Sequence, residues 1–526
     1  MMRKIKTMSN YIYKNDFLLR MISLLYGIIL SYVLFSCLFF QHIQYFAKTQ
    51  FLCSNIILLL IGLFLTFCVY KIINKRYVFF ENHYLIWLFS FVAFCIQIYS
   101  VYNYYFFTDW DSGRITAAAF LIGNNGSIGY DYYFSVYPNN LLLVSIYALI
   151  VKICNLMHIG SHAYYMILCF QSALYILSGI LLFYTIYNIK KNYMLAYSGW
   201  LLYLMLVIAS PWVSIPYSDS VGLIFPIFVM WILTLKSSKR YMTGIRTFVV
   251  ITCACIGYHI KPQIIIILIA TVVVYSIQLF NEKNLNKKLV ISSISAAIIG
   301  VLCVSIVYSG LENKYFQDLD KEMEFGVSHF LMMGLNDKTM GSFYEKDVEF
   351  SASFDSKEER KENNIKIAKA RLHKMGIINT YKLLNRKLLT NYNDGTFAWG
   401  KEGRFYCEFL PSPNKYVAPV LRNIYYKGGK FYSLFCTFVQ MVWLIVLFLS
   451  FFSIFSKKTY LISIAMLSII GLTMFELIFE ARARYLFIYV PIYIILAMIG
   501  VDELISYFKK FKCFTFNKFI GIGKKL

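Results

Sequence analysis

Two acidic residues that could act as a base lie in one short polar segment between long apolar runs. These residues are Asp109 and Asp111, and an alanine-rich stretch with a helical pattern follows them. A carboxylate at the edge of a membrane can act as a general base and take the proton of an acceptor hydroxyl. Arg114 would share a helix face with Asp111 and could meet a phosphate there. The alternative is that Asp111 only caps the helix, a role that aspartate favours.

Three basic residues lie in two further polar turns, where they could bind a phosphate. Lys261 lies in one turn, and Arg482 and Arg484 lie in the other. The planar guanidinium group of arginine binds phosphate through two parallel hydrogen bonds. If the second turn is on the outer side of a membrane, two arginines there run against the usual orientation bias and need a reason. The plainer alternatives are that Lys261 extends its ammonium group to the surface and that the arginines pair with Glu480 or with lipid head groups.

Other polar residues in similar turns are candidates for contacting a substrate. Asp219 follows Tyr217 in a third turn, where capping of the next helix is the simpler role. Asp394 precedes a glycine, which is first of all a turn signal, although a polar turn flanked by aromatic rings could also line a sugar site. The candidates for substrate binding are Tyr137, Asn139, Asn140, Tyr217, Asp219, His259, Asp394 and Glu480.

The runs between these turns are apolar enough to cross a membrane. Hydrophobic residues make up 59% of the 526 residues and charged residues 15%, against about 25% in soluble domains. Repeated apolar runs of roughly 20 residues match the thickness of a bilayer core. The net charge of +24 does not indicate nucleic-acid binding, because the basic residues are scattered through short loops, as the positive-inside rule requires. We therefore predict an all-α polytopic membrane protein of about 12 spans.

The basic clusters between the runs predict which turns face outward. Only one crossing fits between the third span and Lys190-Lys191, yet two apolar runs occur there. The shorter run, 140–157, carries Lys152 and is predicted to lie in the outer interface as an amphipathic helix. Both termini are then cytoplasmic, and the polar turns described above are outside. The alternative is that 140–157 spans and that Lys190-Lys191 breaks the rule.

The predicted organisation follows the apolar runs. The large outer loop, 309–433, holds most of the acidic residues and is nearly balanced in charge, like a small soluble domain. Helical periodicity between 357 and 390 is interrupted at Gly376, which indicates a small, mainly helical domain with a helix stop. The predicted parts are N-terminal spans (1–83), a transmembrane catalytic module (84–308) with a first outer loop (104–162), an extracytoplasmic loop domain (309–433), C-terminal spans (434–502) and a basic cytoplasmic tail (503–526).

Several short segments carry a family resemblance when they are taken in order. They are Asp111-Ser112-Gly113-Arg114, Tyr137-Pro138-Asn139-Asn140, Pro216-Tyr217-Ser218-Asp219, Ile260-Lys261-Pro262 and Glu480-Ala481-Arg482-Ala483-Arg484-Tyr485. From about residue 84 to 502, the layout resembles the GT-C superfamily of membrane glycosyltransferases, especially Gram-positive enzymes related to protein mannosyltransferases and aminoarabinose transferases. Many relatives have Asp-Glu where this chain has Asp111-Ser112, and many lack the two spans that precede the catalytic loop's own span. Asp109 therefore stays an alternative base.

The resemblance implies an activity and a set of partners. It implies an inverting transferase that moves a sugar from a polyprenyl phosphate to an extracytoplasmic acceptor, which would be a cell-wall glycan, a teichoic acid, a lipid or a protein. The donor phosphate would be held by Arg114, Lys261, Arg482 and Arg484. No cofactor would be required, although a divalent metal could take part. The protein would lie in a bacterial plasma membrane, among membrane lipids, with no nucleic-acid partner.

Other functions stay open at this point. A lipid-linked oligosaccharide flippase would need a polar central cavity, and the near absence of charges inside the apolar runs argues against it. A surface-polymer polymerase or ligase also has a large outer loop, but its donor would carry a diphosphate and a longer glycan. A non-enzymatic scaffold would leave the outer acids and the arginine pair unexplained.

Overall fold

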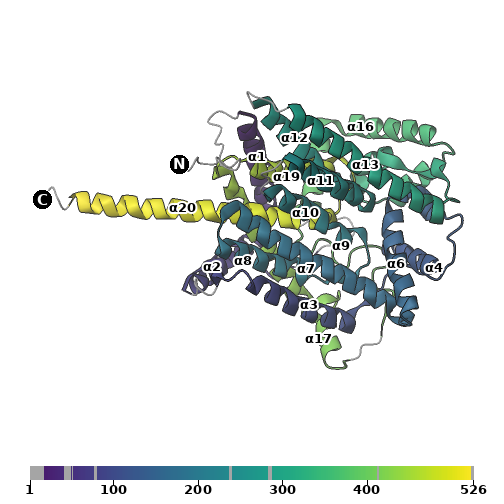
Figure 1. The fold of residues 1–526 in the computed structure, drawn as a ribbon, viewed down its shortest axis with the longest axis horizontal. Helices are drawn as coiled ribbons and strands as arrows, with labels where there is room; N and C mark the ends of the chain where they lie inside the picture. Colours follow the sequence, from purple (N-terminus) through teal and green to yellow (C-terminus); the bar gives the residue numbers. More distant parts are fainter. Residues whose placement is uncertain are drawn as a thin grey trace.

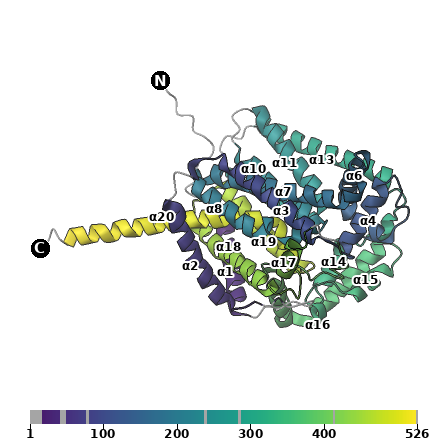
Figure 2. The same ribbon diagram turned by 90° about the horizontal axis from the view of Figure 1, so that it is seen from below.

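The computed structural model is a bundle of helices (Figures 1 and 2). It describes residues 17–40, 49, 51–75, 80–235, 240–281, 287–410 and 414–522. Across these ranges the strands are two short ones, β1 (Phe106–Phe107) and β2 (Glu408–Phe409), which pair antiparallel. The predicted all-α polytopic architecture is confirmed.

Within the described ranges, ten helices are long and apolar enough to cross a membrane, where about twelve spans were expected. Three segments that were predicted to span form only shorter apolar helices, Asn55–Val69, Tyr193–Ile208 and Ser218–Thr234, and a π-helical turn at Leu204–Ile208 and a break after Gly222 interrupt the last two. The segment Pro138–Leu156, which was predicted not to span, is instead long and apolar enough. The long helices are α1 (Phe17–Phe39), α3 (Leu85–Tyr104), α6 (Leu141–Leu156), α7 (Ala163–Lys190), α11 (Arg240–Ile260), α12 (Ile265–Asn281), α13 (Lys287–Tyr315), α18 (Tyr432–Phe451), α19 (Tyr460–Ile478) and α20 (Val490–Ile522). The other helices of the bundle are α2 (Asn55–Lys75), α8 (Tyr193–Tyr203), α9 (Ser218–Gly222) and α10 (Ile224–Thr234).

The helix α6 lies differently from its neighbours. Figure 1 shows α6 running across the direction of α7 and α13 at one end of the bundle. It packs there against α4 (Asp111–Gly123) and α7. Length and composition alone would allow α6 to span. Its direction agrees with the interfacial placement predicted for residues 140–157.

The opposite end of the bundle holds basic residues that the sequence predicts to be cytoplasmic. Lys190, at the end of α7, pairs with Asp502 of α20 at 2.8 Å and with Glu503 at 3.4 Å. Lys458, in the loop before α19, is close enough to Glu503 for the two charges to interact. The α20 helix then extends away from the bundle at this end (Figures 1 and 2). Two of the predicted basic clusters therefore do share one side of the protein.

The large loop between α13 and α18 has two parts with different surroundings. Its first part folds as α14 (Gly326–Gly334), α15 (Glu345–Ala352) and the first half of α16 (Lys357–Tyr392), around a small core of Met332, Leu335 and Ala368. Gly376 has φ +63° inside α16, so the predicted helix stop is confirmed as a sharp kink between two helices. The second part of the loop is not a domain separate from the helix bundle, because Tyr392 and Trp399 are buried in the main core. The short helices α5 (Tyr132–Val136) and α17 (Val417–Tyr425) complete the fold.

Candidate functional site

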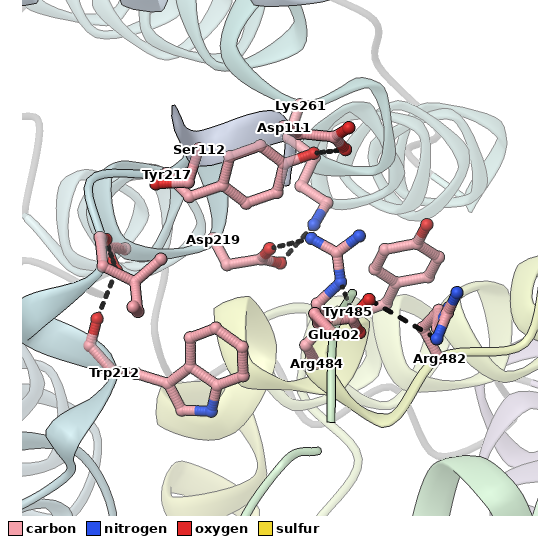
Figure 3. A network of polar contacts seen from close by, with 12 residues as sticks. Asp111, Ser112, Trp212, Tyr217, Asp219, Lys261, Glu402, Arg482, Arg484 and Tyr485 are labelled. Atoms are coloured by element: carbon pink, nitrogen blue, oxygen red, sulfur yellow. Dashed lines mark hydrogen bonds and ion pairs between the residues drawn. The ribbon is translucent and has the colours of Figure 1, made fainter. Parts of the chain in front are cut away.

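Charged residues from several distant segments meet in one buried cluster (Figure 3). The cluster includes the first residue of α4, the helix that packs against α6. Asp111 begins α4, and Asp219 lies in α9, just after Tyr217. The turn between α11 and α12 contributes a lysine, and the turn between α19 and α20 contributes two arginines. Glu402, from the large loop, completes the cluster. We call this set the outer cluster, after the side of the membrane that the sequence predicts for its turns; its members are Asp111, Tyr217, Asp219, Lys261, Glu402, Glu480, Arg482, Arg484 and Tyr485.

Asp219 is the centre of the outer cluster. One carboxylate oxygen accepts a hydrogen bond from the Lys261 ammonium, and the other lies 3.1 Å from Nη1 of Arg484. Asp219 is 1% exposed, so both ion pairs are shielded from solvent. The side chain of Tyr217, the cap residue of α9, makes no capping hydrogen bond, and both carboxylate oxygens of Asp219 contact cations. The capping interpretation of Asp219 is therefore wrong, and so is the extension of Lys261 to the surface.

A second set of ion pairs joins the two arginines to the large loop. Glu402 lies 3.4 Å from Nη1 of Arg482 and 3.2 Å from Nε of Arg484. Glu480 lies 3.0 Å from Nε of Arg482 and accepts a hydrogen bond from the Tyr485 hydroxyl at 2.6 Å. Burial raises the pKa of Glu480, but Arg482 and the Tyr485 hydroxyl outweigh burial and leave this pKa below its ordinary value. The plainer prediction, that the arginines pair with Glu480, is confirmed for Arg482, whereas Arg484 pairs with Asp219 and Glu402.

Aromatic rings form the walls around the cations. The guanidinium carbon of Arg484 lies 5.1 Å from the ring centre of Trp110 and 4.9 Å from that of Tyr217. The Lys261 ammonium lies 4.3 Å from the ring centre of Tyr485. Such rings attract cations while excluding water. Burial lowers the pKa of Lys261 to about 8, against the opposing pull of Asp219.

Asp111 is the acid of the outer cluster that keeps a partly open position. Its side chain accepts a hydrogen bond from the Tyr217 hydroxyl at 2.9 Å, and the residue is half-buried. The cap of α4 is Trp110, and it makes no side-chain capping bond, so Asp111 is not the helix cap. Burial raises the pKa of Asp111, with Arg484 and the Tyr217 hydrogen bond opposing. A carboxyl group with a raised pKa accepts a proton more readily than an ordinary aspartate, which suits a general base.

Two residues predicted to act beside Asp111 lie apart from the outer cluster. Asp109 pairs with Arg404 at 3.0 Å, and both side chains are more than half exposed. Arg114 is exposed on α4. Of the two candidate bases, the structure brings only Asp111 into the outer cluster.

The segment before α6 lies beside Asp111, as expected for a substrate-contacting region. Asn140 donates a hydrogen bond to the Tyr133 hydroxyl at 2.9 Å, and Asn139 donates one to the Asn140 side chain at 3.3 Å. The charge of Asp111 adds to burial in raising the pKa values of Tyr133 and Tyr137. These side chains therefore form the rim of the outer cluster next to Asp111.

Two other candidates have surroundings of their own. His259 stacks on Tyr308, with ring centres 3.9 Å apart, and lines a cavity of about 300 Å³ between α11 and α13. Asp394 is fully buried, accepts hydrogen bonds from Thr396 and from the amide of Ala398, and pairs with Lys401 at 2.7 Å. Asp394 thus closes a turn, the simpler of its two predicted roles.

Sequence reasoning missed Glu402 and Lys387, both in the large loop. Lys387 is buried in α16, and its ammonium donates to the carbonyls of Gly334 at 2.8 Å and Phe479 at 2.5 Å. The backbone of Ala481 also bonds to the large loop, through the Gly341 carbonyl at 2.9 Å. The loop therefore holds the turn that carries Glu480, Arg482 and Arg484. No sequence signal separates these two residues from the many other charges of the loop.

Replacing Lys387 is expected to change how stability depends on pH. Burial lowers the pKa of Lys387 to about 7, with Glu480 and Glu476 opposing. The unfolded chain therefore binds more protons between about pH 7 and about pH 10.4, and stability should rise with pH across this window. Lys387→Met should flatten this rise in thermal unfolding of the detergent-solubilised protein. Lys382→Met, at an exposed position of the same helix, should keep the wild-type slope; equal slopes in all three proteins would contradict the assignment.

Together, the fold and the outer cluster define a multi-pass α-helical membrane protein with a buried ionic site at one end. Among the residues that the structure describes, no group of three His, Cys, Asp or Glu side chains is arranged to hold a metal ion. Residues 7–505 match the family described as conserved hypothetical integral membrane protein, and the chain belongs to this family. No curated protein and no solved structure matches the chain.

Proposed function

We propose that the protein is a membrane glycosyltransferase that moves a sugar from a polyprenyl-phosphate donor to an acceptor hydroxyl. The observation that supports this proposal is the meeting of a partly open carboxyl, Asp111, with three buried cations, Lys261, Arg482 and Arg484. A glycosyl transfer to a hydroxyl needs both a base for the acceptor and positive charge beside the leaving phosphate. The GT-C resemblance supports the same reaction.

The proposed reaction is a single inverting displacement. The acceptor oxygen attacks the anomeric carbon, the bond from that carbon to the phosphate oxygen breaks, and Asp111 takes the acceptor proton. The polyprenyl phosphate leaves with the bonding electron pair. Lys261 and the two arginines stabilise the charge on the leaving phosphate, and the Tyr217 hydroxyl orients the Asp111 carboxylate.

The ion pairs of the outer cluster compete with binding of the donor phosphate. Each of the three cations already contacts a carboxylate, so an incoming phosphate competes with these carboxylates for the same cations. Glu402 is the best placed to leave, because its segment is flanked by Gly400, with φ +72°, and Gly403. We infer that Glu402 occupies the phosphate position until the donor binds.

Removing the charge of Glu402 should therefore strengthen donor binding. We expect Glu402→Gln to lower the KM for the donor by about tenfold, which corresponds to ~1.4 kcal/mol. Glu408→Gln, an exposed acid of the same loop, should leave KM unchanged. Steady-state rates with labelled donor measure both values. A raised KM in Glu402→Gln would show that Glu402 supports the site instead of blocking it.

The donor class can be tested with the purified wild-type protein. Radiolabelled sugars on polyprenyl monophosphate and on polyprenyl diphosphate are incubated separately, and released or transferred sugar is counted. We expect turnover of a monophosphate donor. Turnover of the diphosphate donors alone would favour a polymerase or ligase, and no turnover of either class would remove the proposal.

The remaining parts of the proposal concern placement and partners. We propose a bacterial plasma membrane with both termini in the cytoplasm and the outer cluster on the extracytoplasmic side. The acceptor would be a cell-wall glycan, a teichoic acid, a lipid or a protein that reaches this side. Labelling of single cysteines introduced at the two ends of the bundle, with a membrane-impermeant reagent on whole cells, checks this orientation.

A further inference from the structure

A groove far from the outer cluster runs along α1, where α18 and its extension, the 3-10 turn Phe452–Phe455, cover the helix only in part. Its volume is about 770 Å³. The α1 side of the groove presents Leu24, Ile28 and Phe35, which are each more than half exposed. Since α1 is long and apolar enough to span, these side chains face lipid. The groove is thus open to the hydrocarbon of the membrane.

The floor of the groove is made of small residues. It is formed by Ser23, Gly27 and Ser31. The Ser31 hydroxyl donates to the Gly27 carbonyl at 2.7 Å, and the Ser23 hydroxyl donates to the Ile454 carbonyl at 3.5 Å. A floor of small residues whose hydroxyl protons are already donated within the protein suits a hydrocarbon chain.

One end of the groove is cationic. Arg20 and Lys458 both line it there. Burial lowers the pKa of Lys458, Glu503 opposes this, and the nearby Arg20 lowers the pKa further. The acids of this end, Asp502 and Glu503, also pair with Lys190. Arg20 and Lys458 are therefore close enough to repel each other, and an anion between them would relieve this repulsion.

We propose that this groove binds one anionic membrane lipid, with its phosphate between Arg20 and Lys458 and an acyl chain along the floor. The helix rise from Arg20 to Ser31 is about 16 Å, close to the ~15 Å depth of half a bilayer core. A chain that starts at the cations would therefore run to the middle of the membrane.

The charge of this end selects a lipid over a protein occupant. Residues 1–16 carry four basic residues against one Asp, and residues 504–526 carry six Lys and no acid. Both segments, and the same end of a second copy, are therefore cationic themselves. Anionic head groups are attracted to basic side chains at a membrane surface by about 1 kcal/mol for each residue. The proposal does not depend on the glycosyltransferase function.

Lipid retention in native mass spectrometry tests the proposal. The purified protein is exchanged into micelles that contain equal amounts of phosphatidylglycerol and phosphatidylcholine with the same acyl chains. We expect one phosphatidylglycerol to remain bound to the wild type. The double variant Arg20→Gln, Lys458→Gln should bind it about 30-fold more weakly.

Two further variants make the test specific. Lys457→Gln removes the same charge at an exposed position of the same loop and should leave retention unchanged. Ser31→Phe fills the exposed floor and should reduce retention while the cations stay in place. Equal loss in Lys457→Gln, or unchanged retention in the double variant, would overturn the proposal. The proposal would also be overturned if the wild-type protein is a dimer that Ser31→Phe dissociates while the amount of bound lipid stays unchanged.

Discussion

Asp111→Asn is expected to lower the rate of sugar transfer by about 100- to 10,000-fold, the range that a general base contributes. Asparagine keeps an oxygen that can accept the Tyr217 hydroxyl, so the hydrogen bond of 2.9 Å can persist. What the variant loses is the capacity to take the acceptor proton. Its thermal unfolding should therefore stay close to that of the wild type, and its KM for the donor should change little.

The matched control for this variant is Asp109→Asn. Asp109 lies two residues earlier in the chain, but its carboxylate is exposed and pairs with Arg404. Transfer by this variant should equal that of the wild type. Full activity in Asp111→Asn together with lost activity in Asp109→Asn would assign the base to Asp109, the alternative that the sequence left open.

Arg484→Met is expected to lower the free energy of unfolding by about 3–5 kcal/mol. Arg484 lies between Asp219 and Glu402, and its side chain is 7% exposed. Without it, both carboxylates stay buried and lose a cationic partner. Denaturant titration in mixed micelles measures the loss, and donor turnover should fall as well, because the leaving phosphate loses a cation.

An exposed ion pair of nearly the same length provides the comparison. The pair of Arg404 with Asp109 has an N–O distance of 3.0 Å, against 3.1 Å for Arg484 with Asp219, but its side chains are 81% and 55% exposed. Arg404→Met should therefore cost only about 0–1 kcal/mol. Equal losses in the two variants would show that burial of the outer cluster is not what makes Arg484 important.

The helical architecture and most of the outer cluster could be predicted from the sequence. Apolar runs of bilayer length fix helices, and polar turns that join spans at the same end of a bundle are close to one another. Asp219, Lys261 and Arg484 lie in such turns, so the sequence alone predicts that they lie at the same end of the bundle. The number of long helices was harder to predict, because hydropathy does not detect the π-helical turn at Leu204–Ile208.

The choice between Asp109 and Asp111 depended on where α4 begins. A helix start cannot be placed from sequence to within two residues, and the two acids are only that far apart. The role of Glu402 could not be predicted from the sequence for another reason. It lies in a loop that holds most of the acidic residues of the chain, and only the tertiary packing of that loop against the α19–α20 turn distinguishes it.

The most direct test of the proposed function compares transfer with translocation in one preparation. The protein is reconstituted into sealed vesicles, and a radiolabelled polyprenyl-monophosphate sugar is supplied with a water-soluble acceptor or with water alone. We predict that sugar leaves the donor, that Asp111→Asn prevents this, and that the lipid does not cross the bilayer faster than in protein-free vesicles. Movement of intact donor across the bilayer without release of its sugar would contradict the proposed glycosyltransferase function and identify a lipid transporter.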